Sequence, residues 1–486
     1  MSNKVTIRRL PTGVPGLDNL LGKGLPEFSF NLIAGTPGSG KTTLAHQIMF
    51  SLAAPDYRAL FFTVLGEPTL KMLRYQQQFS FFDHAKLSDS IRFVNLAADL
   101  LHGDFDSVLA RIAAEVEAYE PSLVFVDSFR SVVQSVSAER ASIPDLQHFV
   151  QQLGMQMTSW QATSFLVGEY EGPETESSPV FTVADGIIWL SQNTHRNSMV
   201  RKMQVMKIRG QAQVPGLHTF RIDNAGLQVF PRAIIQPAEM DGQGGAGISG
   251  RISMGVAGLD EMLGGGLPAG YSLLAIGPSG SGKTVLATQF LAEGVRCGEP
   301  GVIAAFEKSP NQLLNNNLHE MVSAGQVGVI DTRSLDLSID ETLHDLIHMI
   351  DHMQAKRVVI DSLSGFELAL APEFSEDFRG SLYRLVAELT SRGVTILMTT
   401  ELDRYTDLHF SPAGSAFLAD AILVQRYVEM GGRFKRVFSI VKVRGSDHSK
   451  DIRLFDVSEE GILIGERITG YDAIMTGHPK GNPRHE

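Results

Sequence analysis

Cysteine is nearly absent from this sequence: Cys297 is the only one among 486 residues. A single cysteine excludes an intrachain disulfide and a zinc site built from cysteine ligands. This usage is typical of proteins in a reducing compartment, where disulfides do not persist. The sequence gives no indication of a redox role.

Long apolar segments are also missing. The first residues, Met1 to Ile7, contain no apolar core of a secretory signal. No run reaches the roughly 18 apolar residues that a membrane-spanning helix needs. We therefore expect a soluble cytoplasmic protein with no membrane association.

Positively charged residues are fewer than negatively charged ones. The chain has 42 Lys and Arg residues against 54 Asp and Glu residues, and its formal net charge is −12. Tight, non-specific binding to nucleic acid or to an anionic membrane rewards a basic face, so this balance argues against both. It does not exclude a local basic pore.

The sequence does contain a glycine-rich loop that is typical of phosphate binding. The loop follows an apolar run, Phe30 to Ala34, and precedes a helix-compatible segment. Glycines let several backbone N–H groups point at one anion, a lysine reaches the terminal phosphates, and the next hydroxyl can bind Mg²⁺. The loop and the residue after it are Gly35, Thr36, Pro37, Gly38, Ser39, Gly40, Lys41, Thr42 and Thr43. This Walker A pattern predicts a site for a nucleoside triphosphate.

A second copy of the loop strengthens this interpretation. It lies 242 positions further along the chain, and the same offset relates two Gly-x-x-Gly-Leu-Asp segments that begin at Gly13 and Gly255. The second loop and the residue after it are Gly277, Pro278, Ser279, Gly280, Ser281, Gly282, Lys283, Thr284 and Val285. The chain therefore contains one nucleotide-binding unit twice.

This repeat predicts two domains, although length alone would suggest about three. We expect the first domain over residues 1–235 and the second over residues 251–468. Residues 236–250 between them are rich in glycine and poor in large apolar side chains, as is typical of a linker. Residues 469–486 contain several glycines and prolines, and we expect a flexible tail there.

The first unit alternates short apolar runs with helix-length amphipathic segments, which predicts an α/β fold with a mainly parallel sheet covered by helices on both faces. Three later runs, 202–208, 217–222 and 227–230, lie close together and predict an antiparallel extension. The expected parallel strands are Phe30 to Ala34, Ala59 to Val64, Ile91 to Asn95, Leu123 to Val126, Ser164 to Val167 and Gly186 to Leu190. The second unit repeats this order.

One apolar run in each unit ends in an acidic residue, Asp127 in the first and Asp361 in the second. A carboxylate at that end of a parallel strand lies beside the phosphate loop, where a Walker B aspartate holds Mg²⁺ directly or through water. We therefore predict that Thr42 with Asp127, and Thr284 with Asp361, bind the metal ion.

Together these features resemble the KaiC family of double-domain, RecA-like ATPases. The resemblance spans nearly the whole chain and is carried by both Gly-x-x-Gly-Leu-Asp segments, both Walker A loops, both Asp-Ser strand ends, Thr399-Thr400-Glu401, and two Lys-x-Arg-Gly segments at Lys207 and Lys442. KaiC is the central ATPase and autokinase of a circadian clock. The resemblance implies tandem RecA-like P-loop domains, the cofactors ATP and Mg²⁺, a homohexamer of two stacked rings with ATP between neighbouring subunits, and a regulatory protein partner.

The Lys-x-Arg spacing also has a physical interpretation, since residues i and i+2 of a strand share a face and can present two cations to one phosphate. In the family this pair reaches a neighbouring subunit's γ-phosphate. The residues that would do so are Lys207, Arg209, Lys442, Arg444 and His448, the last of which has Gln213 at the matching place in the first unit.

The catalytic glutamates depart from the family pattern. KaiC-like sites place two glutamates after the strand that follows the Walker A helix, one of which polarises the attacking water. At the constant offset, Leu65 corresponds to Glu307, so only the second unit keeps a glutamate in register. Glu67 would serve the first unit only if a bulge at Gly66 turned it to the other side.

The family's phosphate-accepting residues are also displaced. KaiC's second unit has adjacent Ser and Thr acceptors shortly before an aspartate that opens a strand, and here that aspartate is Asp420. Ala416 and Phe417 occupy the acceptor positions and have no hydroxyl. The nearest candidate phosphoacceptors are Ser415 and Ser411.

Three hypotheses follow. The first is a KaiC-like ATPase that hydrolyses ATP slowly, mainly in the second domain, and regulates a partner through its nucleotide state. The second is an autophosphorylating serine/threonine kinase of the same architecture. The third is a RecA- or helicase-like, DNA-dependent ATPase, which would need a basic, glycine-rich pore loop that the sequence does not clearly show.

Overall fold

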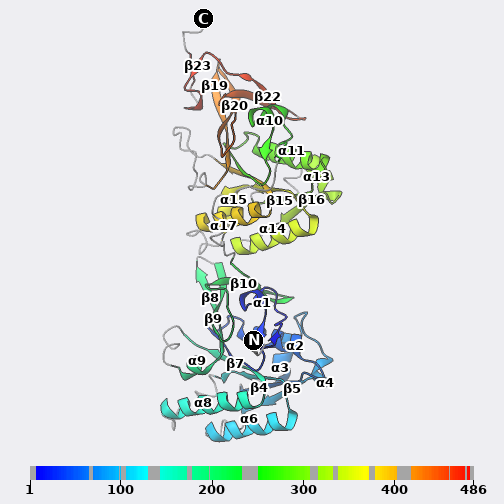
Figure 1. Cartoon of the computed structure of the whole chain (residues 1–486), viewed down its shortest axis with the longest axis vertical. Helices are drawn as coiled ribbons and strands as arrows, with labels where there is room; N and C mark the ends of the chain where they lie inside the picture. The colour runs from blue at the N-terminus through cyan, green and yellow to red at the C-terminus, as the bar shows by residue number, and fades with distance from the viewer. Residues whose placement is uncertain are drawn as a thin grey trace, which may run out of the picture. The chain divides into compact units, whose positions relative to one another are not determined.

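The computed structural model describes residues 7–64, 69–97, 99, 105–129, 143–171, 178–195, 198–232, 250–306, 316–331, 338–370, 378–401, 418–458, 460–476 and 479–481. The chain divides into two compact units, Met1–Arg232 and Ala233–Glu486, and each contains a nine-stranded sheet (Figure 1). Among the described helices, none combines the length and apolar character needed to cross a membrane.

The sheet of the first unit has the strand order β11-β10-β9-β8-β3-β7-β6-β4-β5. Its strands are β3 (Phe30–Gly35), β4 (Ala59–Thr63), β5 (Ile91–Asn95), β6 (Leu123–Asp127), β7 (Thr163–Glu169), β8 (Gly186–His195), β9 (Ser198–Ile208), β10 (His218–Asp223) and β11 (Gly226–Phe230). The pairs from β8 through β3, β7, β6 and β4 to β5 are parallel. The pairs among β8, β9, β10 and β11 are antiparallel, which confirms the predicted extension.

Helices cover both faces of this sheet. They are α1 (Leu17–Leu20), α2 (Lys41–Leu52), α3 (Thr69–Gln76), α4 (Lys86–Asp89), α6 (Phe105–Tyr119), α8 (Ile143–Ser159) and α9 (Pro179–Val183). A short pair of strands, β1 (Arg9–Leu10) and β2 (Leu25–Pro26), precedes β3. Helix α6 buries residues spaced three or four apart, among them Phe105, Leu109 and Ile112, and this stripe fixes the face that it turns to the sheet.

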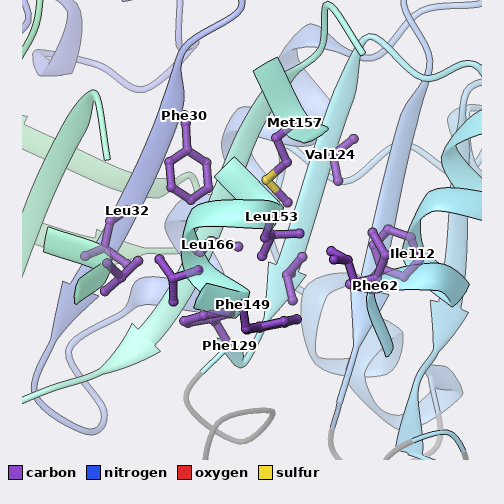
Figure 2. Close-up of a cluster of buried hydrophobic side chains, with 14 of the residues drawn as sticks. Phe30, Leu32, Phe62, Ile112, Val124, Phe129, Phe149, Leu153, Met157 and Leu166 are labelled. Atoms are coloured by element: carbon purple, nitrogen blue, oxygen red, sulfur yellow. The ribbon is translucent and has the colours of Figure 1, made fainter. Parts of the chain in front are cut away.

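The core of the first unit explains why its central strands β3, β4 and β6 are mostly apolar. Successive side chains of a strand point to opposite faces, so Leu32 packs with α6 and α8 while Ile33 packs with α2 on the other face. Figure 2 shows Phe149, Leu153 and Met157 of α8 in the first of these clusters. Full burial of such a side chain stabilises the fold by about 1.5–3 kcal/mol.

The second unit repeats this architecture with the strand order β16-β15-β17-β18-β14-β19-β20-β21-β22. The strands are β14 (Ser272–Gly277), β15 (Gly301–Ala305), β16 (Val327–Asp331), β17 (Arg357–Asp361), β18 (Thr395–Glu401), β19 (Ala421–Met430), β20 (Arg433–Val443), β21 (Arg453–Ser458) and β22 (Gly461–Arg467), preceded by the pair β12 (Arg251–Ile252) and β13 (Leu267–Pro268). The helices are α10 (Ala257–Met262), α11 (Lys283–Arg296), α13 (Asn316–Ser323), α14 (Ile339–Met353), α15 (Leu363–Ala369) and α17 (Phe378–Ser391). The predicted fold class, two α/β units with mainly parallel sheets and antiparallel extensions, is confirmed.

The segment expected to be a flexible tail has local structure where it is described. Strands β23 (Tyr471–Asp472) and β24 (Lys480–Gly481) pair, and a 3₁₀ turn, η4 (Ile474–Thr476), lies between them. Ile474 is buried against Val428 and Val437, and the Arg426 guanidinium donates to the Met475 carbonyl. An apolar side chain with a pocket to fill thus orders a segment that its glycines and prolines would leave loose.

Candidate nucleotide-binding sites

Each Walker A segment connects a central strand to a helix. In the first unit, β3 ends at Gly35 and α2 begins at Lys41. Gly40 has a φ of 102°, and a Cβ there would lie 2.5 Å from Ile222 Cδ1, so the turn requires glycine. Gly282 has the same role at the start of α11, with a φ of 104°. Both turns direct a helix N-terminus toward the loop, as an anion-binding site requires.

The loop lysines are buried, with 6 % of Lys41 and 8 % of Lys283 exposed. Lys41 Nζ donates to the Thr36 carbonyl at 2.7 Å, and Lys283 Nζ donates to the carbonyls of Gly277 and Pro278 at 2.8 and 2.9 Å. Burial lowers the pKa of Lys41. Carbonyl contacts compensate a buried ammonium only in part, so both lysines suit a phosphate ligand.

The predicted Walker B aspartates contact the predicted hydroxyl ligands. Thr42 Oγ1 donates to Asp127 at 2.7 Å, and Thr284 Oγ1 donates to Asp361 at 2.9 Å. Asp361 also accepts a hydrogen bond from the Thr399 hydroxyl. Burial raises the pKa of Asp127 to about 6, although the Thr42 hydroxyl and the Lys41 charge oppose the shift.

These groups line a cavity of about 370 Å³ in the first unit. Its lining comprises Gly38, Gly40, Lys41, Thr42, Thr43, Asp127, Ser128, Val167, Gly168 and Glu169. The donor set fits Mg-ATP, because backbone N–H groups and a lysine can meet the phosphates while hydroxyl and carboxylate oxygens are ligands that Mg²⁺ prefers. The buried hydroxyl of Ser39, in the same loop, lacks a hydrogen-bond partner.

The Lys-x-Arg residues lie at the other end of the central strand. Arg209 forms an ion pair of 3.0 Å with Asp185, and Asp185 accepts a hydrogen bond from the backbone N–H of Phe30, where β3 begins. Lys207 Nζ donates to the Thr182 carbonyl at 3.0 Å. The phosphate loop starts where β3 ends, so the two sites are separated by the strand's length, roughly 17–20 Å.

The second unit has the same arrangement. Arg444 pairs with Asp420 at 3.4 Å, Asp420 accepts from the N–H of Ser272 at the start of β14, and Lys442 donates to the Ala419 carbonyl. His448 donates its backbone N–H to Asp447. Within one chain, neither Lys-x-Arg pair lies near the phosphate loop of its own unit.

Comparison with known proteins decides the family. A family model described as "ATPase: KaiC" matches residues 10–234 and 252–468. The chain belongs to the KaiC family of ATPases. Circadian clock oscillator protein KaiC of Rippkaea orientalis is 28 % identical over 490 residues, which cover 97 % of this chain and 92 % of that protein.

Two further KaiC proteins show the same extent of similarity. KaiC 1 of Synechocystis sp. is 28 % identical over 489 residues, with coverage of 97 % and 92 %. KaiC of Synechococcus elongatus is 26 % identical over 494 residues, with coverage of 98 % and 93 %. This chain is thus a KaiC-family P-loop ATPase with a duplicated domain, as the sequence predicted, and the family implies a nucleotide cofactor.

Some predicted residues cannot be placed. Glu67, Glu307, Ser411 and Ser415 lie outside the described residues. Conversely, sequence reasoning overlooked Glu169 in the first KaiC-like unit and assigned Thr399 no contact in the second. Both belong to the strand beside the Walker B strand. The available signal was an expected strand, Ser164 to Val167, that is followed closely by an acidic residue.

Proposed function

We propose that this KaiC-family chain forms a homohexamer of two stacked rings that binds Mg-ATP between neighbouring subunits, hydrolyses it slowly and regulates a partner protein through its nucleotide state. The separation of each Lys-x-Arg pair from its own phosphate loop carries this proposal. Cations with that spacing suit a phosphate group, and a ring brings them to the next subunit's nucleotide.

To hydrolyse ATP, the chain has to position the water and the phosphates and to stabilise the negative charge of the transferred phosphoryl group. A water oxygen bonds to the γ-phosphorus while the bond from phosphorus to the β–γ bridging oxygen breaks, which gives ADP and inorganic phosphate. Lys41 and Lys283 hold the terminal phosphates in cis, and the neighbour's Lys-x-Arg pair neutralises charge that develops on the transferred group. Thr42 with Asp127, and Thr284 with Asp361, would hold Mg²⁺, which would supply positive charge beside the phosphate oxygens.

The second unit is proposed to contribute most of the turnover. Glu307 has the sequence position of the residue that polarises the attacking water, whereas Leu65 replaces it in the first unit. The first unit then acts chiefly as a nucleotide clamp. The curated relatives are named as clock oscillator proteins, which supports a regulatory role with a protein partner over a metabolic one.

Nucleotide stoichiometry tests the proposal. The purified parent should retain two nucleotides per subunit, and Lys41→Ala and Lys283→Ala should each retain one, as measured by acid extraction and chromatography. Arg58→Ala, which removes a cation that precedes β4 and forms an ion pair with Glu120, serves as the control and should retain two. If both lysine variants retained two nucleotides, the Walker A assignment would be refuted.

A further inference from the structure

The first unit has an additional acidic side chain beside its phosphate loop. Glu169 ends β7, and the strand register places it directly opposite Gly35, the first residue of the loop. On the other side of β7, Asp127 is opposite Val167, two residues earlier on the same strand. The fold therefore brings Glu169 to the sheet edge where the terminal phosphates of a nucleotide would lie.

Contacts within the cavity support this position. Glu169 Oε1 lies 3.8 Å from Lys41 Nζ, and both residues line the 370 Å³ cavity with Asp127. The Glu169 side chain is 53 % exposed, whereas that of Lys41 is only 6 % exposed. The carboxylate thus lies at the accessible mouth of the site and the ammonium at its base.

The first unit has no carboxylate at the sequence position that corresponds to Glu307. Leu65 and Gly66 cannot accept a proton from water, and Glu67 requires a bulge to reach the site. A hydrolytic site without any positioned base is expected to turn over about 10²–10⁴-fold more slowly. Among the described residues that line the cavity, the carboxylates are Asp127 and Glu169, and Asp127 already accepts a hydrogen bond from the Thr42 hydroxyl.

We propose that Glu169 orients the attacking water and accepts its proton in the first unit, and so carries the slow turnover of that unit. This inference rests on the proposed ATPase function of the first site. When the Lys41 ammonium binds the phosphates in place of Glu169, the Glu169 carboxylate can accept a hydrogen bond from water. The water oxygen then bonds to the γ-phosphorus, the β–γ bridging oxygen leaves with ADP, and the proton moves to Glu169.

The matching residue of the second unit is Glu401. Glu401 ends β18, its backbone N–H donates to the Ser364 hydroxyl at 3.3 Å, and Lys283 Nζ donates to two carbonyls of its own loop. Asp361 there accepts a hydrogen bond from Thr399, where the first unit has Val167. The two units thus differ in the polar groups beside the Walker B aspartate, and the inference is confined to the first.

The test uses the full-length Lys283→Ala protein, in which only the first site binds nucleotide. Glu169→Gln and Glu169→Asp are compared with Glu171→Gln, an equal charge change two residues away and outside the cavity lining. Binding of a fluorescent N-methylanthraniloyl-ATP is followed by energy transfer from the two tryptophans, Trp160 and Trp189, which both belong to the first unit. Turnover is followed as ADP formed in a single round.

Glu169→Gln should lower single-round turnover by about 10²-fold or more while the dissociation constant of the fluorescent nucleotide changes by less than about threefold, because a neutral amide still fits the site. Glu169→Asp should recover part of the rate, and Glu171→Gln should match the parent. Unchanged turnover in Glu169→Gln would overturn the inference, and so would weaker binding at unchanged turnover, since that marks a structural partner of Lys41. Loss of turnover in Glu67→Gln alone would also overturn it. A Lys283→Ala protein that binds no nucleotide would instead refute the proposed function.

Discussion

At the scale of single residues, the two units share one fold but have different side chains at some corresponding positions. Thr288 of the second unit matches His46 of the first, and Glu307 matches Leu65. Each pair exchanges a proton-accepting side chain for one that does not titrate. The pairs therefore allow substitutions in which one unit is the control for the other.

The asymmetry of hydrolysis is testable at one such pair. Glu307→Gln should remove most steady-state ATPase activity of the parent, because a lost general base costs about 10²–10⁴ in rate. Phosphate release by the purified protein is the measurement, with Glu320→Gln, on α13, as the control. If Glu67→Gln removed the activity and Glu307→Gln did not, the first unit would be the main catalyst.

A buried histidine gives the first unit a pH dependence of its own. His46 is fully buried on α2 with its ring stacked on Phe61 at 4.6 Å, and burial lowers the pKa of His46 from 6.5 to about 3. Below pH 6.5 the unfolded chain binds a proton at His46 that the folded unit does not. The contribution of His46 to the free energy of unfolding is therefore fully present above pH 6.5, and it is lost as the pH falls toward about 3.

His46→Thr should remove this dependence. Between about pH 6.5 and pH 5 the parent should lose about 2 kcal/mol of unfolding free energy through this residue, and the variant should not. Urea unfolding followed by tryptophan fluorescence reports the first unit alone, because both tryptophans lie in it. His84→Thr, at an exposed site, should behave like the parent; equal acid sensitivity of His46→Thr would contradict the assignment.

At the scale of elements, the sequence was sufficient to place the six parallel strands of the first unit, because most of them are short apolar runs between helical patterns. Strand β8 continues to His195, past its expected end at Leu190. The sequence also predicted that Asp127 and Asp361 end strands beside the loops. It did not predict the lateral neighbours of those strands: that Glu169 lies opposite Gly35 depends on β7 pairing with β3, which lies over 130 positions earlier in the chain. Burial of Ile474 was missed for the same reason, since its partners on β19 and β20 are distant in sequence.

We expect the sequence before β19 to determine whether the chain phosphorylates itself. Ala416 and Phe417 have no hydroxyl, and a displacement of one residue in an extended chain moves an acceptor oxygen by about 3.3 Å and turns it to the opposite side. Incubation with ATP should therefore yield little phosphoprotein, confined to Ser415 or Ser411, by mass spectrometry. Stoichiometric phosphate elsewhere, or phosphate retained in both Ser415→Ala and Ser411→Ala, would contradict this expectation.

At the scale of the whole molecule, nucleotide and assembly should be linked, because a ligand held between subunits stabilises only the assembled state. Removal of nucleotide and Mg²⁺ should shift the mass from hexamer toward monomer, as measured by light scattering after chromatography. Arg209→Ala with Arg444→Ala should shift it in the same direction in the presence of ATP. A mass that does not respond to nucleotide would contradict the proposed interface.

The contacts of Asp185 at the start of β3 have a consequence for cooperative nucleotide binding. Asp185 joins the first residue of β3 to Arg209, and the last residue of β3 opens the phosphate loop. In the proposed ring, one six-residue strand would then connect a subunit's own nucleotide at one end with its neighbour's at the other. Occupancy of one site should favour the next around the ring, giving a sigmoidal nucleotide-binding curve, and Asp185→Asn should lower its Hill coefficient toward one.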